Sequence, residues 1–369
     1  MTYLKLAAAA VAASVSFSAA ASSPFSDMYV FGDSLFDSGN IEQGLRFTNR
    51  IGPDYQNSPY GPASPMFAAA GLGLSVPPSE FGGTNYAVGG HLTADVLASI
   101  TARSTYDAPA GTFNSYFYDL DRQGRELDAR AVFLVEGGGN DIPAFVPPDQ
   151  VSSNLVAAAQ ALRDRGAKYV VLSNVPDFCA APAGVAIEGL VRPLILDMNE
   201  QVRQKVGSSN ILIFDTYKLT QEVVADPMSY GVGVSKEEVS YASFDADCAT
   251  CTQGDPDAKI DGANPNPDSF FFNDDRHPTT IGQQIAGDYI LAILAAPGER
   301  ALMPELGMDD MQAHWRAAHP VMRPTRWITT TDTGKYPVWG GGSGGESERE
   351  TDFGDTATNE ILQYDMGFN

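Results

Sequence analysis

Short apolar runs alternate with longer segments of helical periodicity along this 369-residue chain, and no other feature constrains the fold as much. Runs of this length, bounded by Gly, Asn, Asp or Pro, are typical of buried strands. They occupy residues 28–31, 131–135, 168–173 and 210–214. Because helical segments separate these runs, the pattern predicts an α/β fold with a mainly parallel sheet. In doubly wound sheets of this kind the active site collects at the carboxyl ends of the strands.

Three helices are predicted from the spacing of apolar residues. The first ends at Gly166, before the third strand, and its apolar positions are Leu155, Ala158, Ala159 and Leu162. A second is expected within residues 186–206, where Pro193 should start or kink part of it. The third spans residues 280–294. Its drifting apolar stripe is formed by Ile281, Ile285, Tyr289 and Ile293.

The composition supports a folded core and restricts the partners. Apolar residues make up 43% of the chain, which is enough for one large domain or two smaller ones. The formal net charge is -23 and the pI is about 4.3. Such a chain is repelled by nucleic acid and by anionic membrane surfaces, so neither is expected as an electrostatic partner.

Residues 1–21 are typical of a secretory signal peptide. Lys5 precedes an apolar run rich in Ala and Val, and the triplet Ala19-Ala20-Ala21 predicts cleavage after about Ala21. The apolar run is too short for a membrane-spanning helix. We therefore expect an exported protein.

Three cysteines follow the predicted signal peptide: Cys179, Cys248 and Cys251. An odd count in an exported protein suggests one disulfide and one free thiol. The close pair Cys248/Cys251 is favoured as the bridge, although pairing of Cys179 with either one stays open. A zinc site would need further Cys or His nearby, and the sequence offers none at such spacing.

An acidic segment with eight aspartates extends from Asp245 to Asp275. The spacing of Asp255, Asp257 and Asp261 does not fit an EF-hand loop, so a solvated loop is favoured over a calcium site. No metal is assigned.

The first apolar run ends in Gly32-Asp33-Ser34-Leu35, which presents a serine where a strand ends. A sharp turn from strand into helix would leave the hydroxyl in the open, as a nucleophilic serine requires. Taken alone, the motif also fits an ordinary strand-to-loop turn. Asp33 is expected to have a structural hydrogen-bonding role, and residues 37–40 to fix the start of the following helix and its contacts to neighbouring loops.

A catalytic serine needs a histidine to take its proton and a carboxylate to orient that histidine. Asp274 and His277 stand three apart, so a single turn can place the carboxylate against the imidazole before Pro278 begins a helix. Asp275 is the competing carboxylate. The other histidines are His91, His314 and His319, and none has a comparable context.

Two glycine-bearing segments complete the set. A backbone N–H in residues 83–91 could donate to a carbonyl oxygen that gains negative charge during the reaction. Gly90 is favoured over Gly89 as this donor. Residues 135–141, Val-Glu-Gly-Gly-Gly-Asn-Asp, follow a predicted strand and contain Asn140. Asp141 is expected to brace that loop.

The order of these blocks, Ser34, Gly90, Asn140 and then Asp274/His277, resembles the GDSL, or SGNH, hydrolase family from about Tyr29 to about Leu294. The resemblance implies a flavodoxin-like three-layer α/β/α sandwich with a mainly parallel sheet over residues 22–297. It also implies site roles without any cofactor: Ser34 as nucleophile, His277 as base, Asp274 as its partner, and an oxyanion hole of Ser34, Gly90 and Asn140.

The family implies an exported serine esterase or lipase that hydrolyses small-molecule or lipid esters of short to medium acyl chains. A lysophospholipase or acyltransferase, or a polysaccharide deacetylase, would use the same chemistry. A non-catalytic cell-surface binding module is the rival of another class. Against it stands the complete set of catalytic residue types, which a binding module does not need.

Residues 298–369 form a tail of different character, expected to be mostly irregular. The segment 297–305 resembles the linker of autotransporter esterases, and residues 362–368 alternate as in a β-strand. Only 64 residues follow Glu305, too few for the roughly eight or more strands of a closed barrel. The tail is therefore either the truncated start of an outer-membrane β-barrel or has another role. Secretion and outer-membrane or cell-surface association both stay open.

Overall fold

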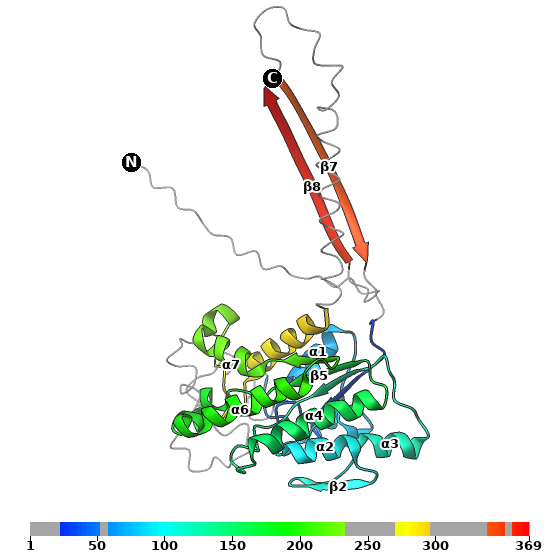
Figure 1. The fold of residues 1–369 in the computed structure, drawn as a ribbon, viewed down its shortest axis with the longest axis vertical. Coiled ribbons are helices and arrows are strands. Elements are labelled where there is room, and N and C mark those ends of the chain that lie inside the picture. Colours follow the sequence, from blue (N-terminus) through cyan, green and yellow to red (C-terminus); the bar gives the residue numbers. More distant parts are fainter. Residues whose placement is uncertain (1–22, 52–57, 233–269, 296–337, 351–355, 369) are drawn as a thin grey trace, which may run out of the picture.

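The computed structural model describes residues 23–51, 58–232, 270–295, 338–350 and 356–368 (Figure 1). The predicted signal peptide, the acidic segment before residue 270, Cys248, Cys251 and the linker after residue 297 lie outside these residues.

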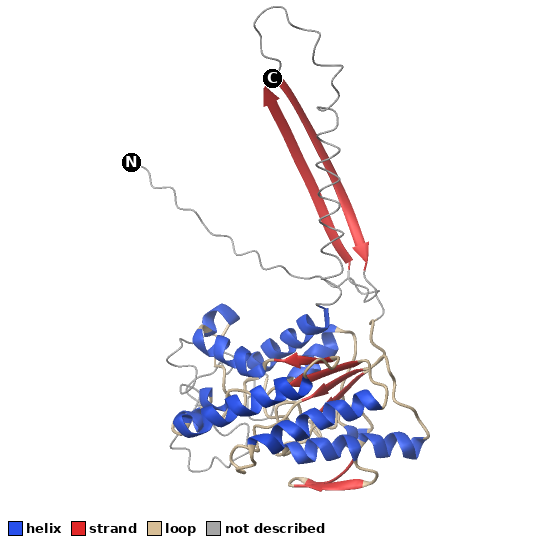
Figure 2. Cartoon of the chain, viewed as in Figure 1, coloured by secondary structure: helices blue, strands red, loops and turns tan. Residues whose placement is uncertain are grey.

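Four parallel strands form the central sheet in the order β1-β4-β5-β6 (Figure 2). They are β1 (Met28–Phe31), β4 (Val132–Val135), β5 (Tyr169–Ser173) and β6 (Ile211–Phe214). Each begins and ends within one residue of its predicted run. The strands β1 and β4 are buried at every position, which explains why they read as unbroken apolar runs.

Residues 84–88 run alongside the free edge of β1. Val30 N donates to Thr84 O at 3.1 Å, Tyr86 N donates to Val30 O at 2.7 Å, and Asn85 forms a parallel bridge with Val30. With this segment counted, β1 lies between it and β4, which is the order of a flavodoxin-like sheet. Ligands bind at such a switch point, beyond the carboxyl ends of the strands.

Helices and a small hairpin surround the sheet. The α-helices are α1 (Ser64–Gly71), α2 (Thr93–Thr101), α3 (Tyr116–Gln123), α4 (Pro148–Asp164), α5 (Pro182–Val185), α6 (Glu188–Val206), α7 (Thr216–Ala225) and a helix over residues 280–295. The 3₁₀ turns are η1 (Ser79–Phe81), η2 (Phe178–Ala180) and η3 (Pro227–Tyr230). The hairpin consists of β2 (Thr105–Ala108) and β3 (Gly111–Asn114).

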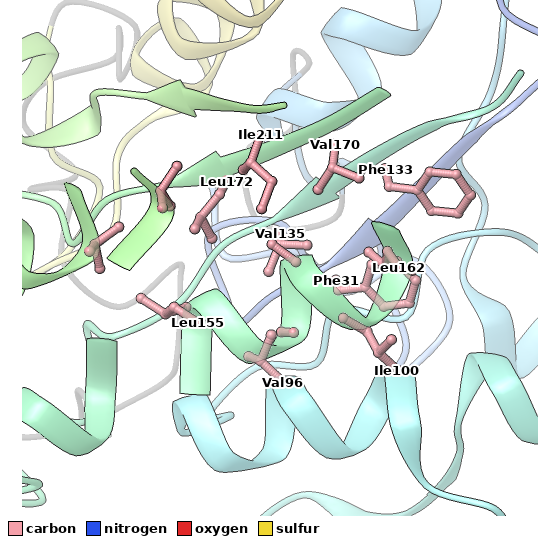
Figure 3. Packing of buried hydrophobic residues seen from close by; sticks show 14 of the residues in the cluster. Phe31, Val96, Ile100, Phe133, Val135, Leu155, Leu162, Val170, Leu172 and Ile211 are labelled. Carbon is pink, nitrogen blue, oxygen red and sulfur yellow. The ribbon is translucent and has the colours of Figure 1, made fainter. Parts of the chain in front are cut away.

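Different helices cover the two faces of the sheet. On one face Phe31 and Val135 pack with residues of α2, α3, α4 and α6, and Figure 3 shows these side chains between strands and helices. On the other face Val30 and Leu134 pack with α1 and the helix over residues 280–295. Successive strand residues point to opposite faces, so each strand contributes to both cores. The result is a three-layer α/β/α sandwich.

The helix α4 illustrates how the sequence pattern produces this packing. Its predicted apolar positions are all buried, and Leu155 and Leu162 are fully enclosed. Pro148 occupies the first turn, where its missing N–H has no helical partner to lose. Gly166, with a φ of 109°, lies just beyond the helix end. Truncating Leu155 to Ala is expected to cost about 2–5 kcal/mol.

The structure refines two helix predictions. The helix expected within residues 186–206 is present as α6, and Pro193 lies inside it rather than at its start, so a kink at Pro193 stays a prediction. In the helix over residues 280–295, Ile290 and Leu294 are the most deeply buried large apolar residues, whereas the predicted stripe one position earlier is half-buried. The shift depends on Gly287, which lies against α1. A Cβ at position 287 would lie only 2.6 Å from Phe67 Cβ, so only glycine lets α1 pack this closely against the helix.

The tail contains two antiparallel strands, β7 (Val338–Glu350) and β8 (Thr356–Phe368). The alternating end therefore lies in a strand, and the preceding run of glycine and serine, residues 340–345, is part of β7 rather than irregular. No helix among the described residues is long and apolar enough to span a membrane.

Candidate active site

Ser34 lies in the turn that follows β1, at the carboxyl edge of the sheet. The carbonyl of Asp33 accepts hydrogen bonds from the N–H groups of Phe36 and Asp37, and its Oδ1 accepts from Leu35 N at 3.0 Å. These contacts fold the chain tightly around the serine. Ser34 is 7% exposed.

The helix predicted directly after Ser34 is absent, since residues 33–40 form turns and bends. Asp37 Oδ1 accepts the N–H groups of Gly39 and Asn40 at 2.7 and 2.8 Å. A side chain that captures nearby N–H groups competes with a helical backbone. Gly39 has a φ of 123°, which also ends any helical turn.

Residues 37–40 instead tie the serine turn to the edge segment alongside β1. Asn40 Nδ2 donates to the carbonyls of Asn85 and Ala87 at 2.7 and 2.8 Å. Asn85 Nδ2 donates in return to Phe36 O at 2.8 Å. The expected contacts to neighbouring loops are therefore present, although the helix is not.

The loop between residues 272 and 278 carries the histidine. Asn273 N donates to His277 O at 2.8 Å, and Asp274 Oδ1 accepts the N–H groups of Arg276 and His277 at 2.8 and 2.7 Å. These bonds close a tight turn. Phe47 lies against the imidazole, with the ring centroids 5.0 Å apart.

Ser34, His277 and Asp274 form one hydrogen-bonded line. Ser34 Oγ lies 2.8 Å from His277 Nε2, and His277 Nδ1 lies 2.6 Å from Asp274 Oδ2. Burial by itself would raise the pKa of the Asp274 carboxyl, but the charge of His277 and hydrogen bonds from His277 and Arg276 lower it below its usual range. Asp274 is therefore suited to remain ionised beside the imidazole.

Asp275, the competing carboxylate, does not contact the imidazole. Its carboxylate pairs with Arg276, at 3.0 Å from Nε, and its carbonyl accepts Ala183 N at 2.9 Å. The backbone of Asp275 therefore fastens the histidine loop to α5.

Gly89 and Gly90 differ in whether the N–H is already used. Gly89 N donates to Asp37 Oδ2 at 2.9 Å. Within the described part of the chain, the N–H groups of Gly90 and Ser34 donate to no acceptor. Gly90 has a φ of 85°, a conformation that glycine adopts without strain.

Asn140 lies between the serine turn and the second glycine segment. Its Nδ2 donates to His91 O at 3.0 Å and to Asp33 Oδ2 at 3.3 Å. Both amide hydrogens are therefore directed at protein acceptors. An oxyanion would have to replace one of them, and the longer contact to Asp33 is the weaker.

The family model described as GDSL-like Lipase/Acylhydrolase matches residues 28–290. The chain belongs to this GDSL family. The match covers the sheet, the serine turn and the histidine loop, but not β7 and β8.

Two bacterial relatives of this GDSL chain are longer than the chain itself. It is 32% identical over 373 residues to an "Uncharacterized protein in trpE-trpG intergenic region" of Pseudomonas putida, with 89% of this chain and 61% of that protein covered. It is 30% identical over 390 residues to "Esterase EstA" of Pseudomonas aeruginosa, with 93% and 58% covered. The chain thus spans about three fifths of the length of these relatives.

Among solved structures, a member of the lipolytic protein G-D-S-L family from Veillonella parvula has 14% sequence identity and a TM-score of 0.41. The alignment covers 73% of this chain and 98% of that one.

Sequence reasoning missed His91 as a part of this GDSL site. Its Nδ1 lies 3.1 Å from Gly32 O, its Nε2 lies 3.3 Å from Tyr106 OH, and its carbonyl holds Asn140. Burial lowers the pKa of the imidazole to about 4, so the ring is neutral near pH 7. Its position directly after Gly90 was the only available signal.

Asp141 braces the loop after β4, in keeping with its expected role. Its Oδ1 accepts Thr93 Oγ1 at 2.7 Å, and its Oδ2 accepts Thr93 N at 2.9 Å. Thr93 is the first residue of α2, so this carboxylate caps the helix and fixes it to the segment that contains Asn140.

A cavity lined mainly by apolar side chains extends beside Ser34 and His277. Leu35 and Phe36 of the serine turn line it, as do Phe178, Phe214, Leu219, Phe271, Phe272 and Ile285. The last six come from η2, β6, α7, the segment that leads into the histidine loop and the helix over residues 280–295. No sequence pattern indicated which of these residues would meet.

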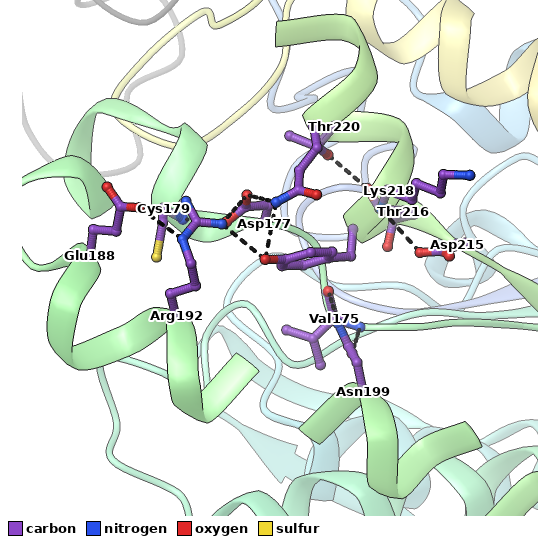
Figure 4. Close-up of polar contacts among 12 residues, drawn as sticks. Val175, Asp177, Cys179, Glu188, Arg192, Asn199, Asp215, Thr216, Lys218 and Thr220 are labelled. Atoms are coloured by element: carbon purple, nitrogen blue, oxygen red, sulfur yellow. Dashed lines mark hydrogen bonds and ion pairs between the residues drawn. The ribbon is translucent and has the colours of Figure 1, made fainter. Parts of the chain in front are cut away.

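Polar contacts brace the wall that η2 and α7 contribute (Figure 4). Arg192 Nη1 donates to Asp177 Oδ2 at 2.8 Å and to Tyr217 OH at 2.9 Å, and Gln221 Nε2 donates to Asp177 Oδ2 at 3.1 Å. Asp177 is 3% exposed. Because Asp177 precedes Phe178, and because Tyr217 and Gln221 lie on α7, these bonds hold two sides of the cavity together.

Among the described residues, no group of three or more His, Cys, Asp or Glu is arranged to hold a metal ion. Cys179 is buried and forms no disulfide within the described residues, whereas Cys248 and Cys251 lie outside them. The aspartates considered for calcium lie outside the described residues.

Proposed function

We propose that this chain is an exported carboxylic ester hydrolase that forms an acyl-enzyme on Ser34. The 2.8 Å separation between Ser34 Oγ and His277 Nε2, beside an apolar cavity that both residues line, carries the proposal. Membership of the GDSL family and similarity to a protein named as an esterase support the same reaction class.

In this mechanism His277 Nε2 takes the proton of Ser34 as its oxygen attacks the ester carbonyl carbon. Asp274 holds the imidazole with its other N–H directed at the carboxylate and stabilises the imidazolium. The C–O bond to the alcohol then breaks, and the alcohol leaves with the proton from His277. Water attacks the acyl-enzyme in the same way, which regenerates the free serine.

The negative oxygen of the tetrahedral intermediate is held by the N–H groups of Ser34 and Gly90 and by the amide of Asn140. Support comes from the two N–H groups, which have no other acceptor among the described residues. Asn140 joins them by exchanging its 3.3 Å contact with Asp33 for the oxyanion. A donor of this kind contributes about 3 kcal/mol to the transition state.

The substrates are small-molecule or lipid esters with short to medium acyl chains, whose tails occupy the apolar cavity. Burial of each methylene group contributes about 0.8 kcal/mol, so the cavity favours chains longer than acetyl. The aromatic side chains of Phe178, Phe271 and Phe272 limit the length that fits. This apolar lining favours esters with acyl chains longer than acetyl over the acetyl esters of a polysaccharide as substrates.

The export proposal is supported by the leader-like residues 1–21, with the hydrolase domain assigned to residues 22–297. Outer-membrane association through residues 298–369 is a separate proposal. It is supported by the likeness of residues 297–305 to an autotransporter linker, and fractionation of expressing cells tests it.

The first experiment measures hydrolysis of p-nitrophenyl esters from acetyl to palmitoyl by the mature chain, beside Ser34→Ala and Ser38→Ala. Ser38 is a matched control, because it is buried in the same turn and its hydroxyl has no partner among the described residues. We expect turnover with a short- or medium-chain optimum, loss of turnover in Ser34→Ala, and retention in Ser38→Ala. Equal rates in wild type and Ser34→Ala would rule out the serine mechanism.

A further inference from the structure

A buried pair of carboxyl groups lies directly beneath the serine turn. Asp33 follows β1 and Glu136 follows β4, and the two side chains are 2% and 1% exposed. Glu136 N donates to Phe31 O at 2.9 Å, which continues the β1–β4 pairing beyond the strand ends. Asp33 N donates to Glu136 Oε2 at 3.1 Å. The glutamate therefore supports the backbone that carries Ser34.

The two carboxyl groups also lie within hydrogen-bonding reach of each other. Among the described residues, no Lys or Arg pairs with either one. Two ionised carboxylates this close cannot both persist in a buried site, so one must bind a proton. The other ionisable groups that face the pair are Asp141, Asp37 and His277.

The hydrogen bonds assign the proton to Glu136. Asp33 Oδ1 accepts Leu35 N and Asp33 Oδ2 accepts Asn140 Nδ2, and donors of this kind favour the charged form. Among the described residues, Glu136 accepts a single N–H, and no donor reaches its Oε1. A charge on that unpaired oxygen would carry the full cost of desolvation.

We propose that Glu136 is a neutral acid at working pH, that it donates its proton to Asp33, and that the pair with its single shared charge positions Ser34 and Asn140. Glu136 is thus a positioning residue that acts through Asp33. The shared proton also weakens the hold of Asp33 on the Asn140 amide, which leaves the amide available to the oxyanion. Burial, with the charge of Asp33 next, raises the pKa of Glu136 well above its usual range.

The close packing of Gly32 fits this arrangement. A Cβ on Gly32 would lie 2.8 Å from Glu136 Oε2, closer than such contacts allow. Only glycine at this position lets the carboxyl group reach Asp33 N. Gly32 therefore leaves room for the Glu136 carboxyl group as well as connecting β1 to the serine turn.

Infrared spectroscopy of the full chain in D₂O at neutral pH tests the protonation state without using activity. Wild type, Glu136→Gln and the surface control Glu200→Gln are compared in the carbonyl region of protonated carboxylic acids. We expect a band in wild type and Glu200→Gln that is lost in Glu136→Gln. Absence of that band from wild type, or its persistence in Glu136→Gln, would overturn the proposal.

Kinetics test the positioning role, and this arm alone depends on the proposed function. Glutamine reproduces both the donor and the acceptor of a neutral glutamic acid, so Glu136→Gln should retain kcat within about 3-fold, whereas Glu136→Ala should lose about 10-fold or more at similar KM. Burial raises the pKa of Glu136, so wild-type kcat should also fall at alkaline pH as this carboxyl group ionises. Glu136→Gln should lack that fall.

A folded Glu136→Gln variant as impaired as Glu136→Ala would show that the charge of Glu136 is needed, and it would overturn the positioning role. Thermal unfolding of both variants separates loss of kcat from loss of fold. A wild-type chain without esterase activity would count against the proposed function, and the infrared band would then decide the proposal about Glu136 alone.

Discussion

The two sides of Ser34 are built from different interactions. On one side, the segments around Gly90, Asn140 and Asp33 are joined by buried hydrogen bonds between side chains and backbone. On the other side, Leu219, Ile285 and the phenylalanines form a cavity wall through apolar packing. We call these the polar side and the apolar side.

This difference predicts how well each side tolerates substitution. Hydrogen bonds are directional and leave a costly unpaired group when one partner is removed, so the polar side should tolerate few changes. Apolar contacts depend on volume more than on direction, so the apolar side should tolerate substitutions that retune the substrate. Four substitutions test this contrast.

The largest effect is expected for Asp274→Asn, which belongs to the hydrogen-bonded line that includes Ser34. The amide cannot hold the imidazole in the required tautomer, so kcat should fall by about 10⁴-fold. Asp275→Asn is the matched control, because its carboxylate pairs with Arg276 rather than with His277. If Asp275→Asn were the more damaging substitution, the assignment of the two aspartates would be reversed.

Asn140→Ala should lower kcat by about 10²–10³-fold, with a smaller change in KM. The reason is that, in the proposed mechanism, the amide acts on the oxyanion and not on the bound ester. The measurement is steady-state kinetics with the best p-nitrophenyl ester. Asn199→Ala serves as a control, since Asn199 bonds the backbone of Val175 and contacts neither Ser34 nor His277. A loss confined to KM would show that Asn140 binds the ground state.

His91, on the polar side, should make the free energy of unfolding of the protein depend on pH. Burial lowers its folded pKa from 6.5 to about 4, so below 6.5 the unfolded imidazole binds a proton that the folded one does not. Stability is therefore lost as pH falls from 6.5 to about 4, by roughly 3 kcal/mol at most from this group.

Urea unfolding of wild type and His91→Gln at the two ends of this window measures the effect. The variant should be less stable at neutral pH but should lose less on acidification. An equal loss in both proteins would assign the acid sensitivity to other groups.

The smallest effect is expected on the apolar side. Leu219→Trp should shorten the preferred acyl chain and lower kcat/KM for medium-chain esters by about 10-fold, because misfit by one or two methylenes costs about 1–3 kcal/mol. Hydrolysis of the acetyl ester should change little. Leu212→Trp, at an exposed position on β6, is the control. An equal loss for acetyl and longer esters would show that Leu219 supports the fold and not the chain-length preference.

Much of the fold could be predicted because its signals are local. The four strands are short apolar runs, of which β1 and β4 are buried at every position, and α4 carries its apolar residues at helical spacing. Ser34, Asn140 and the pair Asp274/His277 could be named because they follow apolar runs or share one short loop. Asp274 and His277 are three residues apart, so local geometry alone brings them into contact.

Other features could not be predicted because their partners are remote in sequence. Glu136 meets Asp33 across 103 residues, and His91 meets Gly32 across 59. The prediction of a helix after Ser34 was wrong. The carboxylate of Asp37 accepts the N–H groups of Gly39 and Gly89, so the backbone does not form helical hydrogen bonds there. The buried face of the last helix depended on how closely Gly287 lets α1 approach.

The sequence by itself determined the strand positions, the identity of the reactive residue types and their order along the chain, since these follow from local periodicity and from chemistry. Only the tertiary structure decided that, within the described parts of the chain, the N–H of Gly90 is unused while that of Gly89 is not. It also decided that Asn140 is held by Asp33 and His91, and which side chains form the cavity. The physical reason is that hydrogen bonding and packing between distant segments depend on how parallel strands align their ends, and no local pattern encodes that alignment.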